Sequence, residues 1–136
     1  MTEFNNQAMF KLSYGLFVCT AKRGDKMNAC IINTAIQVAS EPNTISIAIN
    51  KANYTHDMVK ETGLCNISVI STKASFDLFK HFGFQSGRDV DKFADYSKDA
   101  YQISENGIPY ITVGTNAWFS LKVEKQVDLG SHTLLD

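Results

Sequence analysis

The 136-residue sequence lacks several patterns from which a function is most directly inferred. No apolar run approaches the roughly 18 residues of a membrane-spanning helix, and residues 1–10 lack the basic-then-apolar order of a signal peptide. The charge is nearly balanced, with 13 basic and 14 acidic side chains. We therefore expect a cytoplasmic protein with no membrane partner and no whole-molecule basic field for nucleic acid.

Cysteine pairs and the glycine-rich nucleotide loop are missing as well. Cys19, Cys30 and Cys65 are widely spaced and form no CxxC motif, so we expect no zinc, iron–sulfur or thioredoxin-like site. We interpret the three cysteines as reduced, mostly buried thiols. No Gly-x-Gly-x-x-Gly follows any expected strand, and a Rossmann site is therefore not expected.

Alternation of apolar and polar residues with period two is the clearest positive signal. Over 117–129 the apolar side chains fall on one face of an extended segment, which is typical of a half-buried strand. The same alternation occurs over 10–18, 45–49 and 65–69. The β-rich run 27–40 has a mixed register, and we expect it to be covered on both sides over part of its length.

Turn and capping residues divide these strands. Residues 23–26 form an expected hairpin tip, and residues 41–43 an expected turn. Helices are expected over 55–62, with Thr55 as N-cap and Gly63 as its end, over 72–82, and over 89–93. This order predicts a mainly β (α+β) fold: an antiparallel barrel with two or three short helices.

Four segments, in this order along the chain, resemble a known family: 28–42, 49–55, 82–93 and 130–133. Together they cover nearly the whole chain, and it resembles the flavin reductase-like family of FMN-binding split barrels. More narrowly, it is similar to the clostridial-type flavin reductase domains of high-molecular-weight rubredoxins. The resemblance implies one antiparallel split β-barrel domain over 1–136, short at its C-terminus because family members continue beyond Asp136 with more sheet.

The resemblance implies FMN, or FAD, as cofactor and NAD(P)H as co-substrate. The segment after the strand 45–49 offers a positive charge, side-chain donors and a helix N-terminus to a phosphate, through Asn50, Lys51, Asn53, Tyr54 and Thr55. Without the family, the same residues are better interpreted as a strand-to-helix connection with an N-cap threonine and a solvated lysine.

Two further sets of cofactor residues come from the family. A strand would follow the pyrimidine end and ribityl chain with Asn33, Thr34, Gln37, Val38, Ala39 and Ser40, and a hydrogen bond there would tune the flavin potential. Lys92 matches a family position near the phosphate, although a solvated helix lysine is an equal alternative.

His132 is the expected catalytic residue, because it matches a family histidine on the nicotinamide side of the flavin. Its role there is to orient the hydride donor. Many family members have Gly-Asp-His where this chain has Gly130-Ser131-His132, so the acidic partner of the histidine is missing. His56 and His81 are interpreted as surface or capping residues.

The function expected from the resemblance is an FMN-dependent oxidoreductase that passes electrons from NAD(P)H to a flavin, a rubredoxin or a ferric species. We expect a homodimer with the flavin at the subunit interface and a redox partner such as rubredoxin. Two alternatives remain open: an FMN-binding electron carrier without NAD(P)H activity, and a barrel without flavin that serves an interaction.

Overall fold

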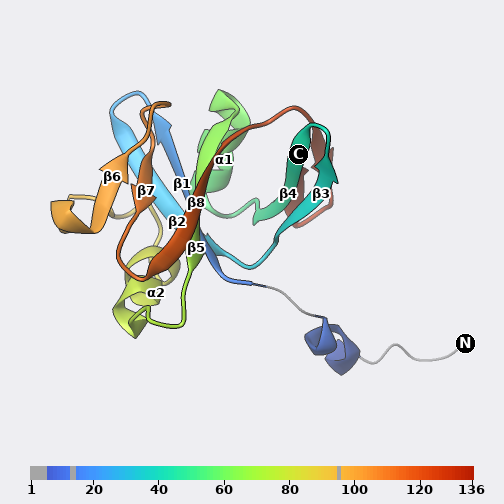
Figure 1. Ribbon diagram of the computed structural model, residues 1–136, viewed down its shortest axis with the longest axis horizontal. Coiled ribbons are helices and arrows are strands. Elements are labelled where there is room, and N and C mark those ends of the chain that lie inside the picture. The colour runs from blue at the N-terminus through green and yellow to red at the C-terminus, as the bar shows by residue number, and fades with distance from the viewer. Residues whose placement is uncertain (1–5, 13–14, 95) are drawn as a thin grey trace, which may run out of the picture.

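The computed structural model describes residues 6–12, 15–94 and 96–136 and contains two four-stranded antiparallel sheets (Figure 1). The first sheet has the strand order β2 (Lys26–Ile32), β1 (Phe17–Arg23), β5 (Leu64–Ile70) and β8 (Thr115–Lys122). The second has the order β3 (Ala35–Ser40), β4 (Asn43–Asn50), β10 (His132–Leu135) and β9 (Gln126–Asp128). A separate hairpin joins β6 (Tyr101–Ile103) to β7 (Pro109–Ile111).

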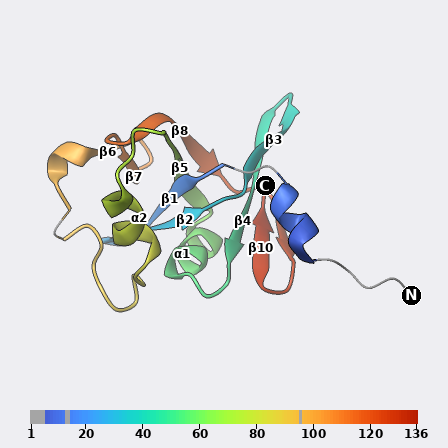
Figure 2. The same ribbon diagram turned by 90° about the horizontal axis from the view of Figure 1, so that it is seen from below.

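Helix α1 (Tyr54–Thr62) lies between the two sheets (Figure 2). Its buried residues Met58 and Val59 join one hydrophobic core with residues of both sheets, among them Ile47, Ile67 and Leu135. Because α1 follows β4 directly and packs on β1 and β2, its N-terminus is held at the junction of the sheets. The antiparallel barrel expected from the sequence is confirmed.

A second core covers the opposite face of the first sheet. Helix α2 (Phe76–Gly83) contributes Leu78 and Phe82, which pack with Val18, Phe93 and Ile111. Strands β1, β2 and β5 are therefore buried on both faces, whereas β8 at the edge of the sheet is mostly exposed. Short 3-10 helices precede β1 and β6, at Asn6–Lys11 and Lys98–Ala100.

Several strand predictions need correction. The run 27–40 is two strands in two different sheets, β2 and β3, and the chain crosses between them at Asn33 and Thr34. The segment 117–129 is likewise divided between β8 and β9, and Phe119, Val127 and Leu129 are exposed. The early strand begins only at Phe17, because residues 6–11 form a 3-10 helix; Tyr14 lies outside the described residues.

The helix predictions are partly confirmed. Gly63 ends α1 with a positive φ of 74°, as expected from its position, but the N-cap is Asn53 and not Thr55, which is buried in the first turn. Helix α2 is shorter than the expected 72–82. The prediction of a short helix at 89–93 is wrong, because these residues form bends and turns.

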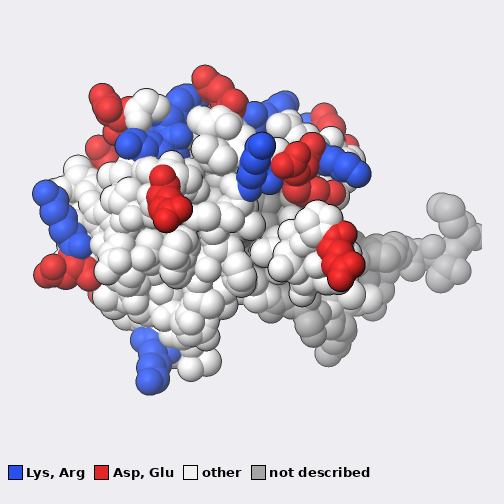
Figure 3. Space-filling view, turned by 45° about the horizontal axis from the view of Figure 1, so that its top comes forward, with Lys and Arg blue, Asp and Glu red and all other residues white. Residues whose placement is uncertain are grey.

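Charged side chains of both signs are interspersed on the face shown in Figure 3. Neither sign dominates that face, in keeping with the near-neutral sequence. Among the residues that the structure describes, no helix has the length and apolar character needed to cross a membrane.

Candidate functional site

A polar pocket of about 250 Å³ opens at the N-terminus of α1. Its walls come from the start of α1, from β2 and from the loop that follows α2, and four of the sequence-predicted cofactor residues line it: Asn53, Tyr54, Thr55 and Lys92. The Asn53 side chain makes no capping hydrogen bond, so the positive end of the helix dipole faces the pocket without a side-chain cap. We call this space the α1 pocket.

Lys92 gives the α1 pocket a buried positive charge. The residue is 2 % exposed, and its Nζ donates hydrogen bonds of 2.7 Å to the backbone oxygens of Ala29 and Phe82. Burial lowers the pKa of Lys92 from its ordinary value. Among the described residues it forms no ion pair with a carboxylate. A buried cation without a counter-ion is costly in a folded protein, and an anionic ligand would relieve that cost.

Asn28, Thr55 and Gly87 form the adjoining wall. Asn28 Nδ2 donates a 2.9 Å hydrogen bond to Thr55 Oγ1, while Asn28 Oδ1 is buried without a hydrogen-bond partner among the described residues. A Cβ at Gly87 would overlap the Asn28 amide, so the loop approaches this closely only with glycine. The wall therefore presents a hydroxyl and an unpaired amide oxygen beside the buried lysine.

Cations surround Tyr54 at the rim of the pocket. The guanidinium groups of Arg23 and Arg88 lie 5.3 and 5.1 Å from the centre of its ring, and Arg23 also donates to its hydroxyl at 2.9 Å. Arg88 forms an ion pair with Asp57, and this bond, with a second from His56, lowers the pKa of Asp57. The pocket rim thus connects the loop after α2 to α1.

The C-terminal end of β4 brings other predicted residues together. His132 on β10 pairs with Asn50 in the ladder, and the Lys51 amide donates to the Ser131 oxygen at 2.9 Å. On the other side of β4, Thr34 accepts a hydrogen bond from the Ala48 amide. Residues distant in sequence therefore flank one strand end, immediately before the loop that leads to the α1 pocket.

Lys51 does not line the α1 pocket. Its Nζ lies 2.5 Å from Asp128 Oδ1 on β9, and this contact, with a hydrogen bond from the Gly130 amide, lowers the pKa of Asp128. Asn50 Oδ1 accepts from the Ala52 amide at 2.8 Å and so shapes the loop. Of the two lysines predicted at the cofactor site, therefore, Lys92 lines the α1 pocket and Lys51 does not.

The remaining residues predicted on β3 lie apart from the α1 pocket. Asn33 accepts a hydrogen bond from Thr34, and Gln37 Nε2 donates to Ala39 and Asn43 inside the β3–β4 hairpin. Val38, Ala39 and Ser40 are exposed, and the strand register shifts between Gln37 and Ala39.

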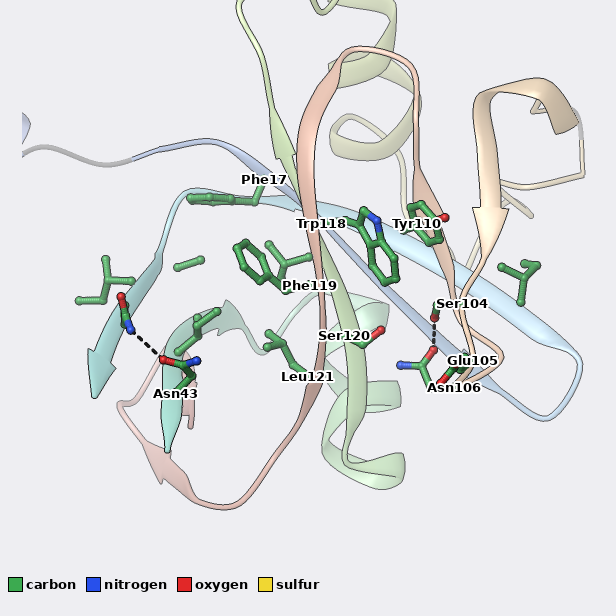
Figure 4. A pocket seen from close by; sticks show the side chains of 16 residues that line it. Phe17, Asn43, Ser104, Glu105, Asn106, Tyr110, Trp118, Phe119, Ser120 and Leu121 are labelled. Atoms are coloured by element: carbon green, nitrogen blue, oxygen red, sulfur yellow. Dashed lines mark hydrogen bonds between the residues drawn. The ribbon is translucent and has the colours of Figure 1, made fainter. Parts of the chain in front are cut away.

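A second, wider groove of about 1160 Å³ lies over β8, between the β3–β4 hairpin and the β6–β7 hairpin (Figure 4). Trp118 stacks on Tyr110 with ring centres 3.9 Å apart on one side of the strand. Phe119 and Leu121 point to the other side, near Phe17. Gln37 also lines this groove, which is mainly apolar and exposes Trp118 and Phe119 by 42 and 45 %.

Each of the three histidines has a polar contact, and His56 differs from its prediction. Ser131 Oγ lies 2.8 Å from His132 Nδ1, so a hydroxyl contacts the ring where many family members have a carboxylate. His56 is not a surface residue: it is 4 % exposed, and its Nε2 lies 2.7 Å from Thr133 Oγ1 on β10. His81 is half-buried, stacked on Tyr96 and hydrogen-bonded to the Lys92 backbone oxygen.

Two antiparallel sheets around α1, with a cationic pocket at the N-terminus of that helix, define a split β-barrel of the FMN-binding type. The family comparison gives the same result for almost the whole chain. Residues 9–135 match the model of the flavin reductase-like domain, and the chain belongs to this family.

Curated relatives cover most of this chain. It is 38 % identical over 130 residues to a high molecular weight rubredoxin of Moorella thermoacetica, spanning 96 % of this chain and 56 % of that protein. It is 34 % identical over 128 residues to a ferric-chelate reductase (NAD(P)H) of Archaeoglobus fulgidus, spanning 94 % of this chain and 74 % of that protein. The chain thus covers little more than half of the first relative.

Solved structures agree on the fold. An FMN-binding protein from Thermus thermophilus superimposes with a TM-score of 0.81 at 20 % identity, covering 99 % of this chain and 73 % of the other. Flavoredoxin from Methanosarcina acetivorans gives 0.79 at 16 % identity, covering 99 and 70 %.

Sequence reasoning missed several residues of the α1 pocket: Asn28, Cys30, Ser86 and Gly87. Asn28 and Cys30 lie in the segment 28–42, which also resembles the family, but their strand has the pattern of an ordinary core strand. Ser86 and Gly87 lie within the segment 82–93 that resembles the family, so their closeness in sequence to Lys92 is the signal that could have found them.

Proposed function

We propose that the chain is an FMN-dependent oxidoreductase that uses NAD(P)H as hydride donor. The observation that supports this most strongly is the unneutralised Lys92 in the α1 pocket, beside Thr55 and the open end of α1. A phosphate dianion matches a buried cation, a hydroxyl donor and a helix N-terminus in both charge and hydrogen bonding. The pocket is of a size for a phosphate and the adjoining part of a ribityl chain.

The residues present fit FMN in further respects. Asn28 Oδ1, buried without a partner, would accept a hydrogen bond from a ribityl hydroxyl. Asn53, Tyr54, Thr55 and Lys92 would hold the phosphate end, whereas Asn33 and Thr34 flank the strand end from which the ring system would be reached. When bound, FMN supplies the hydride-accepting chemistry that no protein side chain provides.

His132 would position the hydride donor. The Ser131 hydroxyl contacts Nδ1, which fixes the ring plane and leaves Nε2 for a polar group of the donor. His132 stands at the same strand end as Asn50, at the start of the loop to the α1 pocket. The donor and the cofactor would then meet at one end of the second sheet.

We also propose a homodimer that completes the flavin site. The exposed apolar side chains favour β3 and β8 as the contact surface: Ile36, Val38, Trp118 and Phe119 are all more than 40 % exposed. The apolar groove over β8 offers a surface for a second copy, since exposed apolar patches mark interaction sites. Phe82 on α2 is fully buried within its own chain and is therefore not available to a dimer contact.

The experiment is steady-state NADH and NADPH oxidation by the FMN-loaded chain, with free flavin, a ferric chelate and a rubredoxin as acceptors. A reductase oxidises the nicotinamide at a rate that saturates with its concentration and needs FMN. A chain that binds FMN but leaves NADH and NADPH unoxidised is an electron carrier, and the reductase proposal fails. If the chain binds no flavin, both the reductase and the electron-carrier functions are excluded.

A further inference from the structure

The three cysteines, far apart in sequence, lie on one face of the first sheet. Cys19 on β1 stands directly opposite Cys30 on β2 in the strand register, and Cys65 lies on β5, the other neighbour of β1. All three are free thiols and belong to the core between the two sheets.

The ladder position of Cys19 and Cys30 suits a covalent bond. Residues directly opposite in an antiparallel pair have Cα atoms roughly 4.5–5.5 Å apart, and disulfides form over Cα separations of roughly 4.4–6.8 Å. Cys65 lies across from neither residue, because Cys19 pairs with Ile67 on β5. The strand register thus favours the Cys19–Cys30 pair, while the Cys65 thiol lies within hydrogen-bond reach of Cys19 from the neighbouring strand.

Only Cys30 of the three lines the α1 pocket. It is 4 % exposed, while Cys19 and Cys65 are fully buried. Small molecules that enter the pocket therefore meet the Cys30 sulfur, next to the charge of Lys92 and the hydroxyl of Thr55.

The surroundings of the two thiols favour Cys30 as the nucleophile and Cys19 as the thiol that reacts second. A hydrogen bond from Cys19 lowers the pKa of Cys30; burial opposes this shift, and a hydrogen bond with Thr55 and the charge of Lys92 add to it. The hydrogen bonds with Cys30 and then Cys65, together with burial, raise the pKa of Cys19 well above its ordinary value. The thiolate is the reactive form of cysteine, so Cys30 is the thiol that reacts first with an oxidant.

We propose that Cys30 is an oxidant-sensitive thiol in the wall of the α1 pocket, and that a hydroperoxide joins it to Cys19 as a cross-strand disulfide. With hydrogen peroxide, the Cys30 thiolate attacks one oxygen, the O–O bond breaks, and the departing hydroxide takes a proton and leaves as water; an organic hydroperoxide releases an alcohol instead. Cys19 then attacks the sulfenic sulfur; the S–S bond forms and the S–O bond breaks, releasing a second water. With hydrogen peroxide, two thiols lose two electrons and two protons, and the peroxide is reduced to two waters.

An anion in the α1 pocket would shield Cys30. This part of the inference rests on the proposed placement of the FMN phosphate, whereas the disulfide itself does not. At a concentration of about 100 times its Kd, FMN leaves about 1 % of the pockets empty, so oxidation through the pocket should slow about a hundredfold. Oxidation would then mark the chain that has lost its cofactor.

The test treats the flavin-free chain with hydrogen peroxide and maps disulfides by mass spectrometry under non-reducing conditions. We expect a Cys19–Cys30 link within one chain and a fall from three thiols to one after denaturation. Cys19→Ser should instead accumulate a sulfenic acid on Cys30 that dimedone traps, and Cys65→Ser, the matched control, should form the disulfide as the wild type does. A disulfide that includes Cys65, links between chains only, or unchanged thiols in the wild type would overturn the proposal.

The wild-type map needs no substitution in the core, so a variant that fails to fold leaves the proposal testable. Repeating the oxidation with FMN and with riboflavin separates the two proposals. Slowing by FMN and not by riboflavin supports the shielding. If the Cys19–Cys30 disulfide forms equally fast with saturating FMN, the thiol pair stands and the phosphate lies elsewhere; if FMN binds and no disulfide forms, the thiol proposal alone is refuted.

Discussion

Replacing Lys92 by methionine removes the buried charge of the α1 pocket but keeps an unbranched apolar side chain of similar length. A hydrogen bond to a charged group contributes about 1.5–3 kcal/mol, and every 1.4 kcal/mol is a factor of ten in affinity, so the Kd for FMN should rise about 10- to 150-fold. Riboflavin, which has no phosphate, should bind the variant and the wild type alike.

The stability of Lys92→Met is a separate quantity. The Ala29 and Phe82 oxygens lose their donor, which costs about 1–3 kcal/mol for each unsatisfied group. Removal of a buried, unpaired charge offsets part of that loss. Urea unfolding of the flavin-free variant therefore has to precede the titration, to show that the measured protein is folded.

The assay is quenching of flavin fluorescence, with Lys51→Met as the matched control. Lys51 pairs with Asp128 at the surface and does not line the α1 pocket, so this variant should leave the Kd for FMN nearly unchanged. Unchanged FMN binding in Lys92→Met, or an equal loss for FMN and riboflavin, would refute the assignment of the phosphate to the α1 pocket.

Three other predictions concern the same region. His132→Ala should leave the Kd for FMN unchanged but slow flavin reduction by NADH about a hundredfold in stopped flow, because the donor loses a positioning contact. Ser131→Ala should slow this reduction less, and equal rates in the wild type and both variants would contradict the role of His132. Gly87→Ala should lower the urea midpoint and weaken FMN binding, since a Cβ overlaps Asn28 and overpacking costs about 1–3 kcal/mol; wild-type values for both would show that the loop moves freely. The pKa of Asp57 is lowered in the folded state, so its contribution to folding stability is present at neutral pH and is lost as the pH falls below about 4. Asp57→Asn should therefore lose less stability than the wild type over that pH range, by at most about 1 kcal/mol because the side chain is half-exposed. Parallel profiles of stability against pH for the two proteins would contradict the assignment.

The barrel could be predicted from local patterns because each strand carries its own alternation of apolar and polar residues. The crossing at Asn33 and Thr34 could not, since β2 and β3 are both apolar and the change of sheet has no local sequence mark. Phe119 and Val127 have the pattern of buried residues and are nevertheless exposed. Alternation identifies the faces of a strand, but the neighbouring elements determine which face is covered.

The site shows the same division. The loop from Asn50 to Thr55 can be predicted as part of the site because a strand, polar donors and the start of a helix follow one another in the sequence. The burial of His56 could not be predicted, because the hydroxyl that forms its buried hydrogen bond comes from Thr133, 77 positions away. Lys92 needed the family resemblance, since nothing local distinguishes a buried lysine from a solvated one.

The most direct test of the central claim is an equilibrium titration of the wild-type chain with FMN and with riboflavin. If the α1 pocket holds the phosphate, Lys92 and one further donor contribute about 1.5–3 kcal/mol each, and FMN should bind at least about a hundredfold more tightly than riboflavin. The protein should then be yellow after FMN is added and the excess removed. Equal affinities for the two flavins, or no binding of either, would contradict the account.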